Sequence, residues 1–316
     1  MRLSTIRRVA LILTLAAASA VALGAQAQPA GMTAKEQANL KHVLNWWLEC
    51  LEGRNLEATA KYQADSYIQH NINFPTGRAG FMKIFGERFK ALGGPVTPAP
   101  TKFANPPVVQ FAKGDFVVLV WEREAKDPAD ASKTYKYNTY DMLRIENGKV
   151  AEHWDYAQKT KGTPRGGAPD GIDYEKVKFN QTAQEQKNIE IATVEFKDIL
   201  QYGHVELAEK VMAPTYIQHN PNVPTGRAAF VEFFSRIRKP EPLQAGWKNK
   251  PTLMFASGPY VFLIVKRAEK DPDDPSQTYP AYWFDMVRVE NGMIQEHWDA
   301  ATKNAPSPAA APGRGN

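Results

Sequence analysis

The stretch that decides the fold occurs twice: residues 67–85 read YIQHNINFPTGRAGFMKIF, and residues 216–234 read YIQHNPNVPTGRAAFVEFF. A second pair follows in the same order, with YDMLRIENGKVAEHWD at 140–155 and FDMVRVENGMIQEHWD at 284–299. Two repeated pairs in one order indicate the duplication of a whole domain. We therefore expect two copies of one domain in tandem.

Each copy begins with the same signal for a helix start. Thr33 and Thr182 are each followed three residues later by a glutamate, which is the capping-box pattern. Between the copies, the chain is rich in glycine and proline with little apolar content, and its last residues are rich in proline, alanine and glycine. The sequence therefore predicts a first domain over 33–158, a linker over 159–181, a second domain over 182–303 and a disordered tail over 304–316.

Within each copy, helical periodicity comes before strand periodicity. In the first copy, an apolar helical face runs from Leu40 to Leu51 and ends near Gly53, a short helix fits 55–64, and a third helix starts after Thr76. Runs rich in β-branched and aromatic residues then predict strands at 108–111, 116–124, 135–145 and 150–156. This order predicts an α+β fold with three helices packed on one face of an antiparallel sheet.

The first 27 residues have the pattern of a secretory signal peptide. Three arginines precede an apolar run over 9–23, and Ala25-Gln26-Ala27 supplies the small residues of a cleavage site. The run is shorter than the roughly 20 residues that a membrane-spanning helix needs. The sequence therefore predicts cleavage near Ala27, a periplasmic or secreted mature protein, and no membrane partner after cleavage.

Charge and cysteine content argue against other classes of function. The chain has 39 basic and 34 acidic residues, and three of the basic ones lie in the leader, which leaves the mature chain at a net charge of +2. Lysine and arginine form no cluster of the kind that binds nucleic acid, so we expect no nucleic-acid partner. Cys50 is the only cysteine and lies in an apolar helical pattern, which predicts a buried and inert thiol.

Four polar residues recur in each copy among apolar neighbours. They are His70, Asp141, His153 and Asp155 in the first copy, and His219, Asp285, His297 and Asp299 in the second. His153 and Asp155 are two residues apart on a strand, so both point to one face of the sheet, and Trp154 points to the other.

The side on which Asp141 lies depends on the hairpin loop that joins its strand to the next. A three-residue loop at 146–148 would place Asp141 opposite His153, whereas a two-residue turn would send it to the other face. We expect the three-residue loop. His70 leaves the second helix in a short extended segment, from which it could converge on the same face.

Three kinds of site are compatible with these residues. The groups could merely satisfy one another, with His153 bonded to Asp141 and His70 to backbone. They could form an acid/base pocket, in which aromatic walls raise the proton affinity of a carboxylate and a histidine holds the substrate oxygen. They could also bind zinc or non-haem iron. We favour the acid/base pocket and predict no metal. A covalent nucleophile is less well supported, because the repeated motifs contain no serine and Cys50 has no counterpart.

The order of three helices and a curved meander, with the motifs YIQHN, PTGR, DMxR and ENGxxxEHWD, resembles the SnoaL-like polyketide cyclases of the nuclear transport factor 2-like superfamily. The resemblance covers nearly all of both copies. It implies cone-shaped domains with a pocket between sheet and helices, and acid/base chemistry of the aldol or isomerase type without a cofactor. The catalytic aspartate of the cyclases would correspond to Asp155 and Asp299. Where a histidine is expected on the preceding strand, this chain has Asp141 and Asp285.

We therefore expect an exported protein that acts, without a cofactor, on a small and largely apolar carbonyl compound. The expected catalytic residues are Asp155 and Asp299, which would take a proton next to the carbonyl, and His153 and His297, which would tune these carboxylates or donate to the oxygen. The expected substrate-binding residues are His70, His219, Asp141 and Asp285, of which the aspartates would fix the imidazoles. A non-catalytic module that holds a small ligand in the same pockets is the alternative.

The tryptophans next to the candidate histidines suggest how the two copies associate. Trp154 and Trp298 point away from the proposed pockets and need burial. We expect the outer faces of the two sheets to pack together, so that one chain forms an intramolecular pseudo-dimer.

Overall fold

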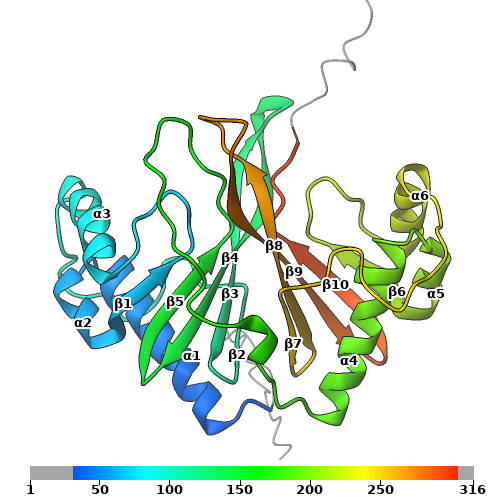
Figure 1. Cartoon of the computed structure of the whole chain (residues 1–316), viewed down its shortest axis with the longest axis horizontal. Coiled ribbons are helices and arrows are strands. Elements are labelled where there is room, and N and C mark those ends of the chain that lie inside the picture. The colour runs from blue at the N-terminus through cyan, green and yellow to red at the C-terminus, as the bar shows by residue number, and fades with distance from the viewer. Residues whose placement is uncertain (1–30, 305–316) are drawn as a thin grey trace, which may run out of the picture.

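The computed structural model describes residues 31–304, which form two similar halves (Figure 1). The predicted signal peptide and nearly all of the predicted tail lie outside the described residues. The first half contains α1 (Ala34–Trp46), α2 (Thr59–Tyr62), β1 (Gln63–Gln69), α3 (Arg78–Ala91), β2 (Val109–Lys113), β3 (Phe116–Asp127), β4 (Asp130–Glu146) and β5 (Lys149–Asp155). The second half contains α4 (Ala183–Thr193), α5 (Ala208–Val211), β6 (Met212–Gln218), α6 (Arg227–Ile237), β7 (Leu253–Ser257), β8 (Tyr260–Lys270), β9 (Thr278–Glu290) and β10 (Met293–Asp299).

The two sheets have the same strand order, β1-β5-β4-β3-β2 and β6-β10-β9-β8-β7. The predicted α+β class and its tandem repetition are therefore confirmed. The sheets are mixed, however, and not purely antiparallel, because β1 and β6 pair in parallel with β5 and β10. We predicted helix up to residue 64 and a short extended segment leading to His70, but no strand of the sheet, because the mixed polarity of residues 63–69 hides it. β1 and β6 contain the first residues of the YIQHN motif and place this motif next to β5 and β10.

The helices form where their start signals predict. Thr33 and Glu36 make a complete capping box, in which the Thr33 amide donates to Glu36 Oε2 at 2.7 Å, and Thr182 and Glu185 repeat it. A π-helical segment, Trp47–Glu52, extends α1 to the predicted end near Gly53. The second helix is shorter than predicted, because a 3₁₀ turn precedes α2 and β1 starts at Gln63. Within the described residues, no helix is long and apolar enough to cross a membrane.

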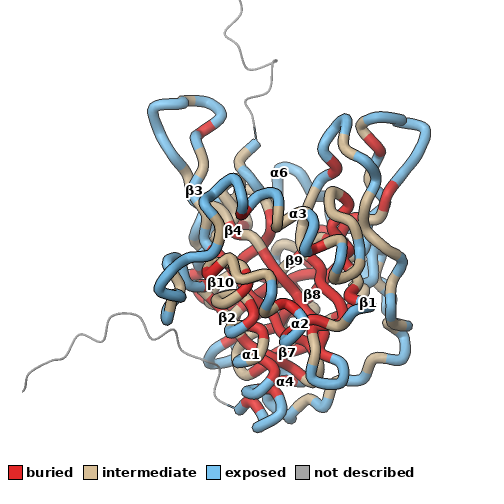
Figure 2. The backbone as a smooth tube through the Cα atoms, turned by 90° about the vertical axis from the view of Figure 1, so that its left-hand side faces the viewer, coloured by how far each residue is buried: buried red, intermediate tan, exposed pale blue. Residues whose placement is uncertain are grey.

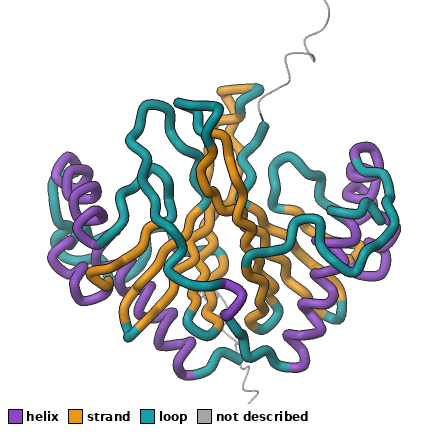
Figure 3. The backbone as a smooth tube through the Cα atoms, in the orientation of Figure 1, coloured by secondary structure: helices purple, strands orange, loops and turns teal. Residues whose placement is uncertain are grey.

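The helices lie on the outer flanks of the molecule, and the two sheets face each other in the centre (Figure 3). One apolar core crosses from sheet to sheet, and the tube coloured by burial shows the central strands as its most buried part (Figure 2). Tyr140 of β4 stacks on Phe284 of β9 with ring centroids 5.4 Å apart. Trp154 is completely buried and Trp298 is 6% exposed. A buried ion pair, Lys113 to Glu185 at 2.7 Å, also joins the halves.

Residues 159–181 connect the halves but are not a free tether. Lys159 pairs with Asp271 at 2.8 Å, Gly166 donates to the Ile72 carbonyl at 2.7 Å, and Tyr174 accepts from the indole of Trp154 at 3.0 Å. A Cβ atom at Gly166 would lie 2.2 Å from the Phe74 carbonyl oxygen, so the close approach requires glycine here. The glycines that suggested flexibility allow this segment to pack closely against the first half.

Candidate active site

The β4–β5 hairpin sets which side chains face the pocket. Its loop is the two-residue turn Asn147-Gly148, with φ of 50° and 72°, and Glu146 pairs with Lys149. The predicted three-residue loop is therefore wrong. A β-bulge at Ala151 then shifts the register by one residue, so that Asp141 lies opposite Asp155. The bulge compensates for the shorter loop, and Asp141 faces the side that we predicted. The second half repeats both features, with Asn291 and Gly292 in the turn.

A hydrogen-bond network holds His153 in the first half. Its Nε2 lies 2.6 Å from Asp141 Oδ1, and the other oxygen of Asp141 accepts from the Trp121 indole at 2.7 Å. Gln69 Nε2 lies 3.1 Å from His153 Nδ1, and Gln69 Oε1 accepts from the Asn71 amide, which fixes the orientation of the Gln69 side chain.

These contacts determine the protonation state of His153. An amide NH₂ can only donate, so Nδ1 accepts and the ring proton lies on Nε2, from which it is donated to Asp141. Burial opposes the imidazolium, whereas the Asp141 carboxylate favours it and raises the pKa of His153 overall. Because the Gln69 amide leaves no acceptor for a second N–H, we infer a neutral His153 with its proton on Nε2.

Asp155 is the carboxylate of this network that keeps an oxygen free. Its Oδ2 accepts from Asn71 Nδ2 at 2.9 Å, whereas its Oδ1 is buried without a hydrogen-bond partner in the described structure. Burial raises the pKa of Asp155 to about 6; a positive charge on His153 would lower it, and the Asp141 charge raises it. Asp155 is therefore a carboxylate that can both accept and return a proton near neutral pH.

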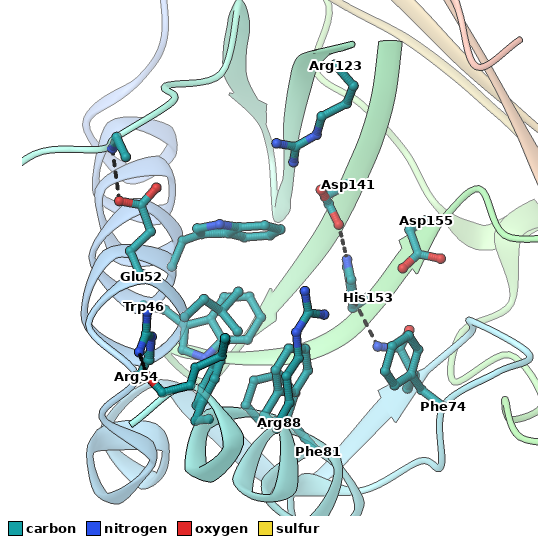
Figure 4. A pocket seen from close by; sticks show the side chains of 17 residues that line it. Trp46, Glu52, Arg54, Phe74, Phe81, Arg88, Arg123, Asp141, His153 and Asp155 are labelled. Carbon is teal, nitrogen blue, oxygen red and sulfur yellow. Dashed lines mark hydrogen bonds and ion pairs between the residues drawn. The ribbon is translucent and has the colours of Figure 1, made fainter. Parts of the chain in front are cut away.

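A cavity of about 560 Å³ opens in front of these groups, which is a typical size for a small-ligand pocket (Figure 4). Asp141, His153 and Asp155 lie together on one wall, and the guanidinium groups of Arg88 and Arg123 point into the space. Aromatic rings from α1, its π-helical extension, the loop between β1 and α3, and α3 itself cover much of the rest, namely Trp46, Trp47, Phe74, Phe81, Phe85 and Phe89.

The prediction that His70 converges on this site is wrong. His70 lies on the opposite face of the sheet, where it stacks on Trp154 with ring centroids 4.7 Å apart and bonds Glu152 at 3.1 Å. Its counterpart His219 likewise stacks on Trp298 and bonds Glu296. Neither histidine can bind a substrate in its pocket as we expected.

The two neighbours of His70 in the YIQHN motif, Gln69 and Asn71, contact the site residues instead. Along the extended YIQHN segment, side chains alternate, so Gln69 and Asn71 face the pocket when His70 faces away. Neither residue was predicted to belong to the site, although the alternation of side chains along this motif indicates both. The sequence prediction also missed Trp121, which reaches Asp141 from β3 and for which the apolar strand pattern gave no signal.

The second half retains the four repeated polar residues in a different network. Glu195 stands at the position of Trp46, thirteen residues after the capping threonine in each copy. It lies 2.8 Å from His297 Nδ1, and Asp285 lies 3.2 Å from His297 Nε2. Although burial opposes the charged ring, the two carboxylates raise the pKa of His297 well above its ordinary value, so this histidine is an imidazolium.

Asp299 differs from Asp155 in its contacts. Its Oδ1 accepts from the Ala301 amide at 2.9 Å, and its Oδ2 accepts from Asn220 at 2.7 Å. The cavity of about 730 Å³ in this half is lined by Asp285 and Asn220 but not by His297 or Asp299. Asp155 has one oxygen without a described hydrogen-bond partner, whereas both oxygens of Asp299 accept hydrogen bonds and Asp299 does not line its cavity.

Each half places three groups close enough to be considered as metal ligands. They are Asp141, His153 and Asp155, and Asp285, His297 and Asp299, whose ligand atoms lie within 4.8 Å of one another in each set. A metal-binding histidine needs a ring nitrogen with a free lone pair. Both nitrogens of His153 and of His297 are engaged by protein partners. The contacts of the described side chains thus fit a hydrogen-bond network better than a metal centre.

Two five-stranded mixed sheets of the same strand order, each flanked by helices, are the fold of two nuclear transport factor 2-like domains. Residues 41–162 match the family model of the SnoaL-like polyketide cyclases, so the first half of the chain is a SnoaL-like polyketide cyclase domain. The resemblance seen in the sequence is thereby confirmed. The family model covers only this half, and the second half repeats its strand order.

Solved structures similar to this chain include a candidate polyketide cyclase from Acidithiobacillus ferrooxidans, with 21% identity and a TM-score of 0.28 over 39% of this chain and 89% of that one. Another is a LEH-like epoxide hydrolase from M. tuberculosis, with 14% identity and a TM-score of 0.27 over 37% and 83%. A third is TerC co-crystallised with polyporic acid, with 16% identity and a TM-score of 0.28 over 38% and 92%. A search of curated proteins found no match.

Proposed function

We propose that the first half removes a proton next to the carbonyl group of a small, largely apolar compound, with Asp155 as the base and without a cofactor. The observation that carries this proposal is that Asp155, which lines an aromatic cavity, has a buried carboxylate oxygen, Oδ1, that accepts no hydrogen bond from the described residues. A carboxylate with a pKa of about 6 is a stronger base than an ordinary aspartate and is still largely ionised at neutral pH.

In the proposed step the C–H bond next to the carbonyl breaks, its proton moves to the Asp155 carboxylate, and the electron pair is delocalised onto the carbonyl oxygen as an enolate. Asp155 can then return the proton to another carbon, as an isomerase does. Alternatively the enolate carbon can form a bond to a second carbonyl in an aldol reaction, and the resulting alkoxide takes the proton back from Asp155. In a lyase reaction the enolate expels a leaving group, which departs with its electron pair and takes that proton. His153 and Asp141 act as positioning residues, because they are hydrogen-bonded to each other and neither bonds the Asp155 carboxylate.

We propose that this chemistry is confined to the first half. Both oxygens of Asp299 already accept hydrogen bonds, and Asp299 does not line its cavity. His297, held as an imidazolium between two carboxylates, cannot accept a further proton. We therefore no longer expect Asp299 and His297 to be catalytic.

The test uses exchange of carbon-bound hydrogen, which detects proton abstraction without knowledge of the natural reaction. The mature protein in D₂O is incubated with a panel of enolisable aromatic ketones and keto acids, and deuterium uptake is followed by mass spectrometry. We expect wild type to catalyse this exchange, and Asp155→Asn to lower the exchange rate by at least about 100-fold. The matched control Asp299→Asn should keep the rate within about twofold. EDTA should leave the rate unchanged. Equal exchange in wild type and Asp155→Asn would remove Asp155 from the mechanism.

The alternative of a non-catalytic binding module gives a different result in the same experiment. It predicts that panel compounds bind to wild type and to Asp155→Asn with similar affinity, and that neither protein exchanges their hydrogens. Loss of exchange on chelation alone would instead support a metal at the same residues.

A further inference from the structure

Two arginines in the first cavity have no role in the step described above. Arg123 comes from β3, where its guanidinium lies over the Trp121 ring at 5.2 Å and its Nε donates to Thr139 at 3.3 Å. Arg88 comes from the last turn of α3. Both guanidinium groups point into the space in front of Asp141 and His153 (Figure 4). Among the described residues, no carboxylate forms an ion pair with either of them.

The carboxylates that line the same cavity are already committed. Glu52 accepts from the Ala104 amide at 3.0 Å, and Asp141 accepts from Trp121 and His153. Asp155 bonds Asn71 and, under the proposed function, needs its free oxygen for the substrate. The cavity therefore contains two guanidinium groups, those of Arg88 and Arg123, with which no described carboxylate pairs, together with the proposed base Asp155.

A similar pair of arginines recurs in the second half. Arg267 of β8 is the counterpart of Arg123, and Arg238 directly follows α6, one residue beyond the counterpart of Arg88. Both line the second cavity, and neither forms an ion pair with a described carboxylate. Trp121, by contrast, is replaced by Val265. The two copies have thus kept paired guanidinium groups while other parts of the pocket changed.

We propose that the substrate of the first cavity carries a carboxylate on a planar apolar body, and that Arg88 and Arg123 bind this carboxylate. This inference rests on the proposed function in one respect, because it names the substrate class of the same site. A guanidinium group binds a carboxylate through two parallel N–H bonds, and the aromatic walls provide flat apolar surface for the rest of the ligand. A phosphate would bring a second negative charge into a cavity that already contains Asp141 and Asp155, which disfavours it.

The arrangement also orients the substrate. Because Asp155 repels a carboxylate, the acid group is bound at the two guanidinium groups and the enolisable carbon is left to face Asp155. Arg88 and Arg123 are therefore specificity-determining residues, which select an acid over its neutral analogue and fix the end at which the proton is removed.

The experiment compares two ligands that differ in charge but little in shape, 2-naphthoate and 2-naphthamide, by isothermal titration of the full mature chain. Wild type is compared with the double variant Arg88→Gln/Arg123→Gln and with the matched double variant Arg238→Gln/Arg267→Gln in the second cavity. We expect wild type to bind 2-naphthoate at least tenfold more tightly than 2-naphthamide. Arg88→Gln/Arg123→Gln should lose this preference, and Arg238→Gln/Arg267→Gln should keep it. Higher salt should lower the affinity for 2-naphthoate and leave the affinity for 2-naphthamide unchanged.

Three results would overturn the proposal: equal affinity of wild type for the two ligands, a naphthoate preference that survives in Arg88→Gln/Arg123→Gln, or tighter binding of 2-naphthyl phosphate than of 2-naphthoate. Circular dichroism checks that the variants are folded, and retained naphthamide affinity shows that the cavity is intact. Asp155→Asn should bind 2-naphthoate at least as tightly as wild type does. Failure of the exchange assay with an intact naphthoate preference would therefore refute the proposed catalysis and leave this inference standing.

Discussion

Replacing Asp155 by asparagine should stabilise the protein at neutral and alkaline pH. The pKa of Asp155 is raised from an ordinary 3.8 to about 6 in the native state, chiefly by burial. The native state therefore binds this proton more tightly than the unfolded state does. As a result, the free energy of unfolding falls as the pH rises from about 4 to about 6 and is constant, for this group, above that range.

The size of the effect follows from the same shift. A pKa of about 6 in place of 3.8 corresponds to about 3 kcal/mol of stability lost by ionising Asp155 in the folded protein. Asparagine keeps an acceptor for Asn71 and removes the buried charge. We therefore expect Asp155→Asn to be more stable than wild type by about 1–3 kcal/mol at pH 8 and by almost nothing at pH 4.

The measurement is urea unfolding, followed by circular dichroism, of wild type and Asp155→Asn at both pH values. Glu87→Gln is the control, because Glu87 is an exposed carboxylate that forms no ion pair among the described residues. A gain for Asp155→Asn that is as large at pH 4 as at pH 8 would show that charge is not its cause. A loss of stability at pH 8 would refute the buried, ionised carboxylate on which the proposed base depends.

Three further predictions concern rate, charge and export. At low substrate concentration, the exchange rate per enzyme should rise about tenfold per pH unit up to about pH 6 and then level off, because only ionised Asp155 accepts a proton. A pH-independent rate would contradict this. Glu195→Gln should lower the pKa of His297, as measured by NMR titration of the ring protons, because one of its two carboxylate partners is lost; an unchanged titration would contradict it. Intact-mass analysis of the exported protein should show cleavage near Ala27, and a retained leader would disprove the signal peptide.

The sequence was sufficient for the class of fold and for the face of the sheet on which Asp141, His153 and Asp155 lie. The predicted pairing of Asp141 with His153 is wrong, because Asp141 lies opposite Asp155. An Asn-Gly dipeptide is the strongest signal for a two-residue turn, and that turn alone would have placed Asp141 on the wrong face. The extra residue lies in the strand, as a bulge at Ala151, rather than in the loop. Nothing in the local sequence marks that bulge, because it is formed through pairing with strands on both sides.

The divergence of the two halves could not be inferred from the repeated motifs, because it arises outside them. The same Asp, His and Asp residues are present in both, yet a glutamate on the first helix of the second copy turns a neutral histidine into an imidazolium. Trp46 and Glu195 occupy equivalent positions in helices whose apolar patterns differ little. Only the packing of that helix against the last strand shows that Glu195 reaches His297.

The segment between the halves gives a physical reason for the asymmetry of the two sites. Gly171 donates to Glu152 at 2.7 Å, and Asp170 accepts from Tyr282 of the second half at 2.6 Å. Glu152 in turn holds His70, whose side chain is fully buried against Trp154. The segment thus covers the face of β5 that lies opposite Asp155 and ties it to the second sheet.

The second half has no equivalent cover within the described residues. There the side chain of His219, which stacks on Trp298 as His70 does on Trp154, is 29% exposed, and that of Glu296 is 19% exposed. A carboxylate that must remain buried with one oxygen unpartnered needs a rigid strand behind it, since a mobile strand would let that oxygen find a donor or admit water. Residues 159–181 supply this support to β5. We infer that the contacts of this segment with Glu152 and with Tyr282 of the second half help to maintain the free carboxylate of Asp155.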